Sequence, residues 1–279
     1  MRFGFHVSIA GGFSKVLERA AQRDCETIQF FSRNPRGWKY SPLDEEEVKL
    51  FKKDIEQTDI DPVFVHMPYL PNLASSNNSL HQRSTDSVVE ELKRAEILGA
   101  QYVITHVGSS VGKTIETGLR QVTKAISQAL DMVKNRVILL LENTSGSGSG
   151  VGSTFEEIRS IIGQVGFPER IGVALDIAHA FEAGYDFRTR AAVDKTLAEF
   201  DRVVGLERLH LVHLNDSKSE LRSRADRHWH IGEGKIGLEG FECLVNHTAL
   251  KGLPAIMETP RKDAKEDLKN MKVVRGLVK

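Results

Sequence analysis

Short apolar runs alternate with amphipathic stretches along the whole chain. Eight of the apolar runs have the length and composition of β-strands, and they cover residues 3–8, 27–32, 62–68, 102–108, 137–143, 172–177, 209–215 and 254–259. Each run precedes a stretch with the 3.6-residue apolar period of a helix, at 12–23, 45–58, 79–98, 114–134, 154–163, 189–204, 238–247 and 263–278. This alternation indicates an α/β protein with a parallel sheet.

Two architectures share this alternation, a closed (β/α)8 barrel and an open doubly wound sheet. The residues at the strand ends favour the barrel. Each of the last six predicted strands ends at or near a residue that can bind a metal: His66, His106, Glu142, Asp176, His213 and Glu258. Barrel strands converge on one rim at their carboxyl ends, whereas an open sheet spreads these ends along a line. We therefore predict a single TIM barrel over residues 1–279, with a metal site at its C-terminal rim.

The two-residue period of the strands supports the same arrangement. An apolar residue stands two positions before five of these six side chains, and these apolar residues are Phe64, Ile104, Leu140, Ala174 and Ile256. Alternate residues of a strand share a face, so the apolar and the polar residue point the same way. We expect the apolar side chains to fill the barrel and the polar ones to cap its open end.

Two loops add further candidates. His179 follows Asp176 by three residues, and Asp226 and His228 lie in a basic loop after the seventh predicted strand. The set then holds five histidines and four carboxylates, which exceeds what two zinc ions take comfortably. Three zinc ions with three or four ligands each would use them all if one carboxylate bridges. A polar barrel mouth that binds no metal is the competing interpretation.

Composition limits the possible partners and compartment. The chain has 279 residues, of which 40% are hydrophobic, and 38 basic residues balance 38 acidic ones. Any nucleic-acid surface must therefore be a local patch. Cys25 and Cys243 lie far apart and form no paired motif, which fits a reducing compartment. No apolar run is long enough for a signal sequence or a membrane span, so we expect a cytoplasmic protein without a membrane partner.

The segment 31–40 is the best candidate for such a patch. Its sequence, FSRNPRGWKY, mixes Arg33, Arg36 and Lys39 with Trp38 and Tyr40. Basic and aromatic side chains together are typical of surfaces that bind nucleic acids. An ordinary solvated loop would have a similar composition, so both interpretations stay open.

Several motifs resemble those of the endonuclease IV family of apurinic/apyrimidinic endonucleases. They are LDIAHAFEAGYD, HLNDSKSELRSRADRHWHIGEGKIG, GLPAIMETP, ENTSGSGS and HMPYLPNL, and the resemblance covers the whole chain. It implies a xylose-isomerase-like TIM barrel with three zinc ions. By this resemblance His66 and His106 bind the first zinc, and Glu142 bridges it to the second. Asp176, His213 and Glu258 complete the second zinc site, and the third takes His179, Asp226 and His228.

The resemblance also implies a substrate and a reaction. Arg36, Tyr69 and Leu70 would enter double-stranded DNA at an abasic site, and Glu142 would help to position a hydroxide. The expected reaction hydrolyses the phosphodiester 5′ to the abasic site, leaving a 3′-hydroxyl and a 5′-deoxyribose phosphate. Blocked 3′ ends would be further substrates, and we expect a monomer.

Two other functions stay open. A metal-dependent sugar isomerase or epimerase on a similar barrel would need about four ligands and one or two Mn²⁺ or Mg²⁺ ions, which leaves five candidates without a role. A damaged-DNA binding protein with structural zinc would need closed metal sites.

Overall fold

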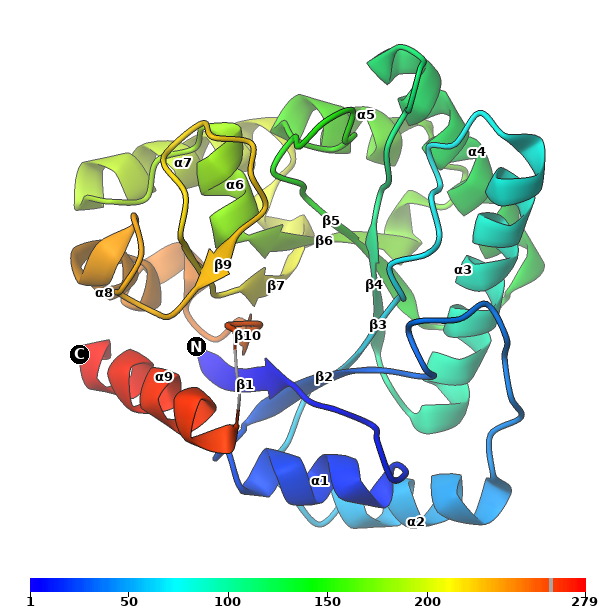
Figure 1. Ribbon diagram of the computed structural model, residues 1–279, viewed down its shortest axis with the longest axis horizontal. Helices are drawn as coiled ribbons and strands as arrows, with labels where there is room; N and C mark the ends of the chain where they lie inside the picture. The colour runs from blue at the N-terminus through cyan, green and yellow to red at the C-terminus, as the bar shows by residue number, and fades with distance from the viewer. Residues whose placement is uncertain (261–262) are drawn as a thin grey trace.

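The computed structural model describes residues 1–260 and 263–279, and its eight long strands form a closed barrel (Figure 1). The strand order around the barrel is β1-β10-β7-β6-β5-β4-β3-β2. All eight pairings are parallel. The strands are β1 (Arg2–His6), β2 (Thr27–Phe31), β3 (Val63–His66), β4 (Tyr102–His106), β5 (Ile138–Glu142), β6 (Ile171–Asp176), β7 (Leu209–His213) and β10 (Pro254–Met257). The predicted TIM barrel is confirmed, and the open doubly wound sheet is excluded.

The helices surround the strands as an outer ring (Figure 1). Those that the sequence predicts are α1 (Ser14–Ala21), α2 (Glu45–Ile55), α3 (Asn78–Leu98), α4 (Ile115–Met132), α5 (Phe155–Gln164), α7 (Arg190–Val203), α8 (Gly237–Val245) and α9 (Ala264–Leu277). Six of them begin after a side chain that accepts a hydrogen bond from a backbone N–H of the first turn. Such caps satisfy donors that a helix start leaves open.

Three elements near the rim were not predicted. Helix α6 (Ile177–Ala183) starts directly after β6, because Asp176 is the last strand residue and also caps the helix by accepting from the His179 backbone N–H. The short strands β8 (Asp216–Ser217) and β9 (His228–Trp229) follow β7 and pair antiparallel. Both features lie in the segments that carry candidate ligands.

The interior of the barrel is apolar, as the two-residue period predicts. Its side chains form a separate buried cluster of Phe64, Ile104, Leu140, Ala174, Leu211 and Ile256. A larger apolar core lies between the strands and the helices. Strand register then sets neighbouring polar ends side by side, pairing His106 with Glu142 and Asp176 with His213. The packing below therefore determines which polar groups meet at the rim.

Two further expectations concern the cysteines and the membrane. Cys25 and Cys243 are both free thiols. Among the described residues, no helix combines the length and apolar character that crossing a bilayer requires.

Gly4 provides a test of how tightly the barrel closes. A Cβ at this position would lie 1.7 Å from the backbone oxygen of Thr27, where β1 meets β2. We expect Gly4→Ala to lower the free energy of unfolding by about 3 kcal/mol or more, because backbone rather than a flexible side chain must move. Urea denaturation measures this change.

The matched control is Gly163→Ala in α5, where nothing lies within 4 Å of the added carbon. There alanine should raise stability by about 0.5–1 kcal/mol, because it restricts the unfolded chain in a helical position. Equal effects at the two glycines would contradict the close β1–β2 contact.

Candidate metal centre at the barrel rim

Potential metal ligands gather in three groups at the C-terminal ends of the strands. Within each group the candidate ligand atoms all lie within 4.8 Å of one another. The groups consist of His66, His106 and Glu142, of Glu142, Asp176, His213 and Glu258, and of Asp176, His179 and His228. Glu142 belongs to the first two and Asp176 to the last two. The shared carboxylates join the three groups into one continuous centre.

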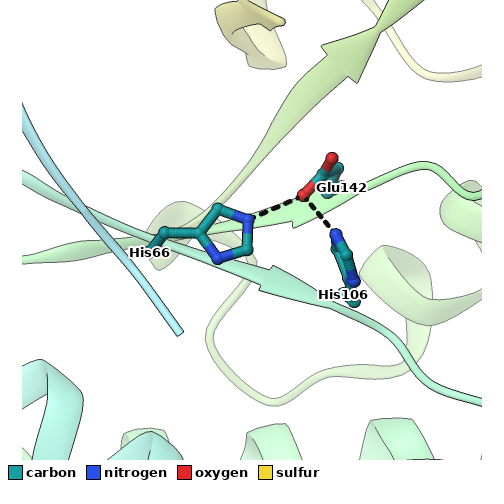
Figure 2. A group of neighbouring side chains, drawn as sticks. All are labelled: His66, His106 and Glu142. Carbon is teal, nitrogen blue, oxygen red and sulfur yellow. Dashed lines mark hydrogen bonds and ion pairs between the residues drawn. The ribbon is translucent and has the colours of Figure 1, made fainter. Parts of the chain in front are cut away.

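Figure 2 shows the first group, in which two imidazoles face one carboxylate oxygen. The Nε2 atoms of His66 and His106 each lie 3.0 Å from Oε2 of Glu142. Nδ1 of His66 lies 2.7 Å from the backbone oxygen of Met67. A carbonyl oxygen can only accept a hydrogen bond, so Nδ1 of His66 carries the proton. Its Nε2 is thereby left as the atom directed at the centre.

The second group surrounds one imidazole with three carboxylates. Nδ1 of His213 lies 3.0 Å from Oε1 of Glu142, 3.7 Å from Asp176 and 3.6 Å from Glu258. The side chains of His213, Glu142 and Asp176 have no exposed surface. Buried carboxylates in this number need positive charge among them, because desolvation of an uncompensated charge costs several kcal/mol.

The third group brings two imidazole nitrogens face to face. Nδ1 of His179 lies 3.0 Å from the backbone oxygen of Asn143, and Nδ1 of His228 lies 3.4 Å from that of Glu258. Both Nδ1 atoms therefore donate, and the two Nε2 atoms approach to 3.2 Å. Neutral rings would place lone pairs opposite each other, which is unfavourable unless a cation lies between them. This donor set fits a divalent metal ion.

Asp226 lies beside the third group rather than inside it. Its Oδ1 is 3.3 Å from Nε2 of His179, and its side chain is 58% exposed. Its φ of 58° falls in the left-handed region, which non-glycine residues rarely adopt. Two backbone contacts hold it there, since the N–H groups of Asp226 and Arg227 both donate to the buried carboxylate of Glu182.

The facing charges shift the proton affinities of these groups. Burial alone would raise the pKa of Glu142, but His106 and His213 outweigh it and hold that pKa well below its usual value. Burial opposes protonation of His213, yet Glu258 and Glu142 raise its pKa to about 9. The pKa of His179 lies well above its usual value because Asp176 and Asp226 overcome the effect of burial. The centre thus favours cations, whether protons or metal ions.

Gln29 in β2 was not predicted from the sequence, although it contacts two residues of the centre, Glu258 and His213, and also His6. Its Nε2 donates to Oε1 of Glu258 at 2.6 Å and lies 2.8 Å from Nδ1 of His6, while its Oε1 lies 2.7 Å from Nε2 of His213. That amide oxygen accepts, so Nε2 of His213 carries the proton and Nδ1 faces the carboxylates. An amide between the apolar residues Ile28 and Phe30 of a strand was the available signal, and the structure buries it fully.

Two other buried polar side chains, next to each other in the chain, organise the surroundings of the centre. Asn215 donates to Oδ2 of Asp176 at 2.8 Å and accepts from the backbone N–H of Glu258 at 2.7 Å. Asp216 accepts from four backbone N–H groups between residues 232 and 237. Asp216 therefore orders the segment after β9.

A cavity of about 450 Å³ opens onto the centre, bounded by Phe31 and Tyr69 together with residues of the three groups. Tyr69 and Leu70 follow β3 and are 67% and 38% exposed. Arg36 is also exposed, in the loop that follows the carboxyl end of β2. The three residues expected to contact DNA therefore lie in loops on the side of the barrel where the cavity opens.

Comparison with known proteins agrees with this geometry. Residues 17–274 match the family model described as xylose isomerase-like TIM barrel. Two relatives named probable endonuclease 4, from Cenarchaeum symbiosum and Methanosphaerula palustris, are 43% and 45% identical. Each alignment covers 99% of this chain, and 99% and 98% of the relative.

A solved structure gives the same assignment. The crystal structure of endonuclease IV from Thermus thermophilus is 36% identical and superposes with a TM-score of 0.89, covering 99% of this chain and 98% of that one. With identities this high over nearly complete chains, the protein belongs to the endonuclease IV family, a family of DNA-cleaving hydrolases within the xylose isomerase-like TIM barrels.

Proposed function

We propose that this protein is a zinc-dependent apurinic/apyrimidinic endonuclease. It hydrolyses the phosphodiester 5′ to an abasic site in double-stranded DNA and leaves a 3′-hydroxyl and a 5′-deoxyribose phosphate. The observation that carries the proposal is the union of three ligand groups through Glu142 and Asp176, beside a cavity lined by Phe31 and Tyr69. Removal of 3′-blocking groups requires the same phosphodiester chemistry, and we include it in the proposal.

Three zinc ions suit the nine candidate ligands. His66, His106 and Glu142 would hold the first, and Glu142 with Asp176, His213 and Glu258 the second. His179 and His228 of the third group would hold the third, together with Asp226, whose Oδ1 lies beside them at 3.3 Å from Nε2 of His179. When bound, zinc ions polarise a phosphodiester and make water acidic enough to supply hydroxide near neutral pH. Imidazole and carboxylate ligands are those that zinc uses in catalytic sites.

Glu142 has the central role among the chain's own residues. Its Oε2 faces the imidazoles of His66 and His106, and its Oε1 faces His213. One rigid carboxylate thereby fixes the spacing of the first two groups. The reacting phosphate and the attacking water would be aligned by this fixed spacing, which is how an enzyme lowers the entropic part of a barrier.

Selectivity in this proposal comes from the absent base. An abasic nucleotide has lost its pairing and much of its stacking, so rotating it out of the duplex requires less energy. Arg36, Tyr69 and Leu70 would enter the duplex and stabilise the displaced nucleotide. Contacts of basic side chains with DNA phosphates would supply affinity. Because the chain as a whole is neutral, these contacts must come from a local basic patch.

A second candidate, a metal-dependent sugar isomerase or epimerase, is favoured by the xylose isomerase-like barrel. Such an enzyme would need only the group of Glu142, Asp176, His213 and Glu258. The paired imidazoles of the first and third groups would then have no function. The high identity to endonuclease 4 relatives also favours the nuclease.

Glu142→Gln tests the proposed role of this carboxylate. The amide keeps the shape of the side chain but loses the charge that joins the first two groups. We expect nicking of a duplex with one abasic site to fall by orders of magnitude while the protein remains folded. Glu156→Gln, an exposed change at the start of α5, is the matched control. Wild-type nicking by a metal-replete Glu142→Gln sample would refute the proposed role.

A metal count separates the two candidate enzymes. We expect elemental analysis of the active protein to find close to three zinc ions per chain. Chelation should abolish nicking, and zinc should restore it. One or two ions of Mn²⁺ or Mg²⁺, with sugar isomerisation and no nicking, would instead establish the isomerase.

A further prediction concerns Gln29→Leu. This change removes the acceptor for His213 and a donor to Glu258, so both side chains lose their fixed orientation. Loss of such an orienting contact typically weakens metal binding by about 10–100-fold. Competition between the stripped protein and a zinc-binding dye measures the affinity without any activity assay. Gln22→Leu, at the exposed end of α1, should leave zinc affinity unchanged, and equal affinities for both variants would argue against the role of Gln29.

A further inference from the structure

A second buried charged cluster lies apart from the metal centre. It consists of Glu91 and Arg94 on α3 and of Ser32, Arg33 and Tyr40 in the loop after β2. Glu91 is fully buried, while Arg33 and Arg94 are 5% and 8% exposed. We call these five residues the Glu91 cluster, and the segment between β2 and Pro42 the 32–41 loop.

Glu91 receives hydrogen bonds from both ends of the loop. The Ser32 hydroxyl donates to its Oε2 at 2.5 Å, and Nε of Arg33 donates to its Oε1 at 3.3 Å. The hydroxyl of Tyr40 donates to the same Oε1 at 3.3 Å. One carboxylate on α3 therefore ties the first residues of the loop to its last aromatic residue.

Arg94, one helical turn further along α3, also connects both ends of the loop to the helix. Its Nη2 donates to the backbone oxygen of Ser32 at 2.7 Å, and its Nη1 donates to that of Ser41 at 2.9 Å. Within the loop, the guanidinium of Arg33 lies 4.1 Å from the centre of the Tyr40 ring and donates to the backbone oxygen of Gly37. Trp38 is covered by Arg83 of α3 at 4.2 Å.

These ties leave the middle of the loop exposed. The side chain of Arg36 is exposed to solvent while its backbone N–H donates to the Asn34 side chain at 3.0 Å. The loop is thus fixed at both ends and along one side, and it presents Arg36 from a defined backbone position.

The energetics argue that this cluster serves more than stability. Burial raises the pKa of Glu91, a sign that its charge is costly at this site, although Ser32, Arg33 and Arg94 reduce the shift. Apolar residues of similar volume often stabilise such positions better than buried ion pairs do. Unlike apolar contacts, the hydrogen bonds of charged groups are directional, so each one here fixes the position of one point of the loop.

We infer that Glu91 is a positioning residue that holds the 32–41 loop in the conformation that presents Arg36 to DNA. The inference rests on the proposed function, through the role given to Arg36. Ordering the loop before DNA arrives removes an entropic cost from binding, so Glu91 acts on affinity rather than on hydrolysis.

The first experiment measures the loop without DNA. The chain has two tryptophans, so Trp229→Phe leaves Trp38 as the single tryptophan, whose emission can be excited selectively at the red edge of the absorption band. In this background we expect Glu91→Gln to raise the acrylamide quenching constant of Trp38 at least about twofold, because the loop opens locally. Glu90→Gln, a partly exposed neighbour on α3, should leave it unchanged. Equal quenching in the two variants would overturn the inference whatever the protein's activity.

The second experiment uses nicking of an abasic duplex by the zinc-loaded enzyme. We expect Glu91→Gln to raise KM about tenfold with kcat and zinc content unchanged, because only binding is affected. Glu90→Gln again serves as the control. If wild-type enzyme does not nick abasic DNA, the proposed function fails, while the quenching result still decides whether Glu91 holds the loop.

A double-mutant cycle separates positioning from a general structural role. If Glu91 acts through Arg36, adding Glu91→Gln to Arg36→Ala raises KM no further than Arg36→Ala alone. Additive effects would overturn the inference. Should Glu91→Gln fail to fold, Ser32→Ala takes its place, because it removes one donor to Glu91 and the acceptor for Nε of Arg94.

Discussion

The fully buried carboxylate of Glu142 is the constraint on which the rim depends. A carboxylate in this position is stable only with positive charge against both oxygens. The strand ends place imidazoles against these oxygens, with His66 and His106 at one and His213 at the other, and a proton or a metal ion bound there supplies the charge. Each of His66, His179 and His228 turns its Nδ1 to a backbone oxygen and its Nε2 to the centre. The barrel therefore fixes both the position of the rings and the nitrogen that each presents.

Much of this arrangement was predictable because it follows from periods along the chain. The alternation of strands and helices predicts the barrel, and the two-residue period predicts the apolar residues Phe64, Ile104 and Leu140 inside it. Once the barrel closes, residues one strand apart must meet at the rim. His66, His106 and Glu142 could thus be assigned to one place from the sequence, before any distance was known.

Other features depend on contacts that no local pattern reports. Gln29 reaches His213 across 184 residues of sequence, and Ser32 reaches Glu91 across 59. Helix α6 is short and follows β6 without a loop, so its start resembled the end of a strand. The left-handed backbone of Asp226 is held by a hydrogen bond from its N–H to the carboxylate of Glu182. Residue spacing along the chain does not identify this pair. Chain periodicity predicts which residues share a layer, whereas pairing within the layer depends on the three-dimensional packing.

The metal centre and the Glu91 cluster balance the negative charge of buried carboxylates in different ways. Both bury carboxylates that collect donors from distant segments. In the Glu91 cluster the positive charge belongs to the chain, since Arg33 and Arg94 are permanently charged. In the metal centre the carboxylates are paired with imidazoles, whose positive charge depends on bound protons. A proton or a metal ion can occupy each imidazole nitrogen, and only one of them at a time. In the Glu91 cluster, the arginines of the chain itself therefore balance the buried carboxylate as soon as the chain folds. The rim instead takes up cations from solution. This difference distinguishes the cluster that positions a loop from the centre that is suited to chemistry.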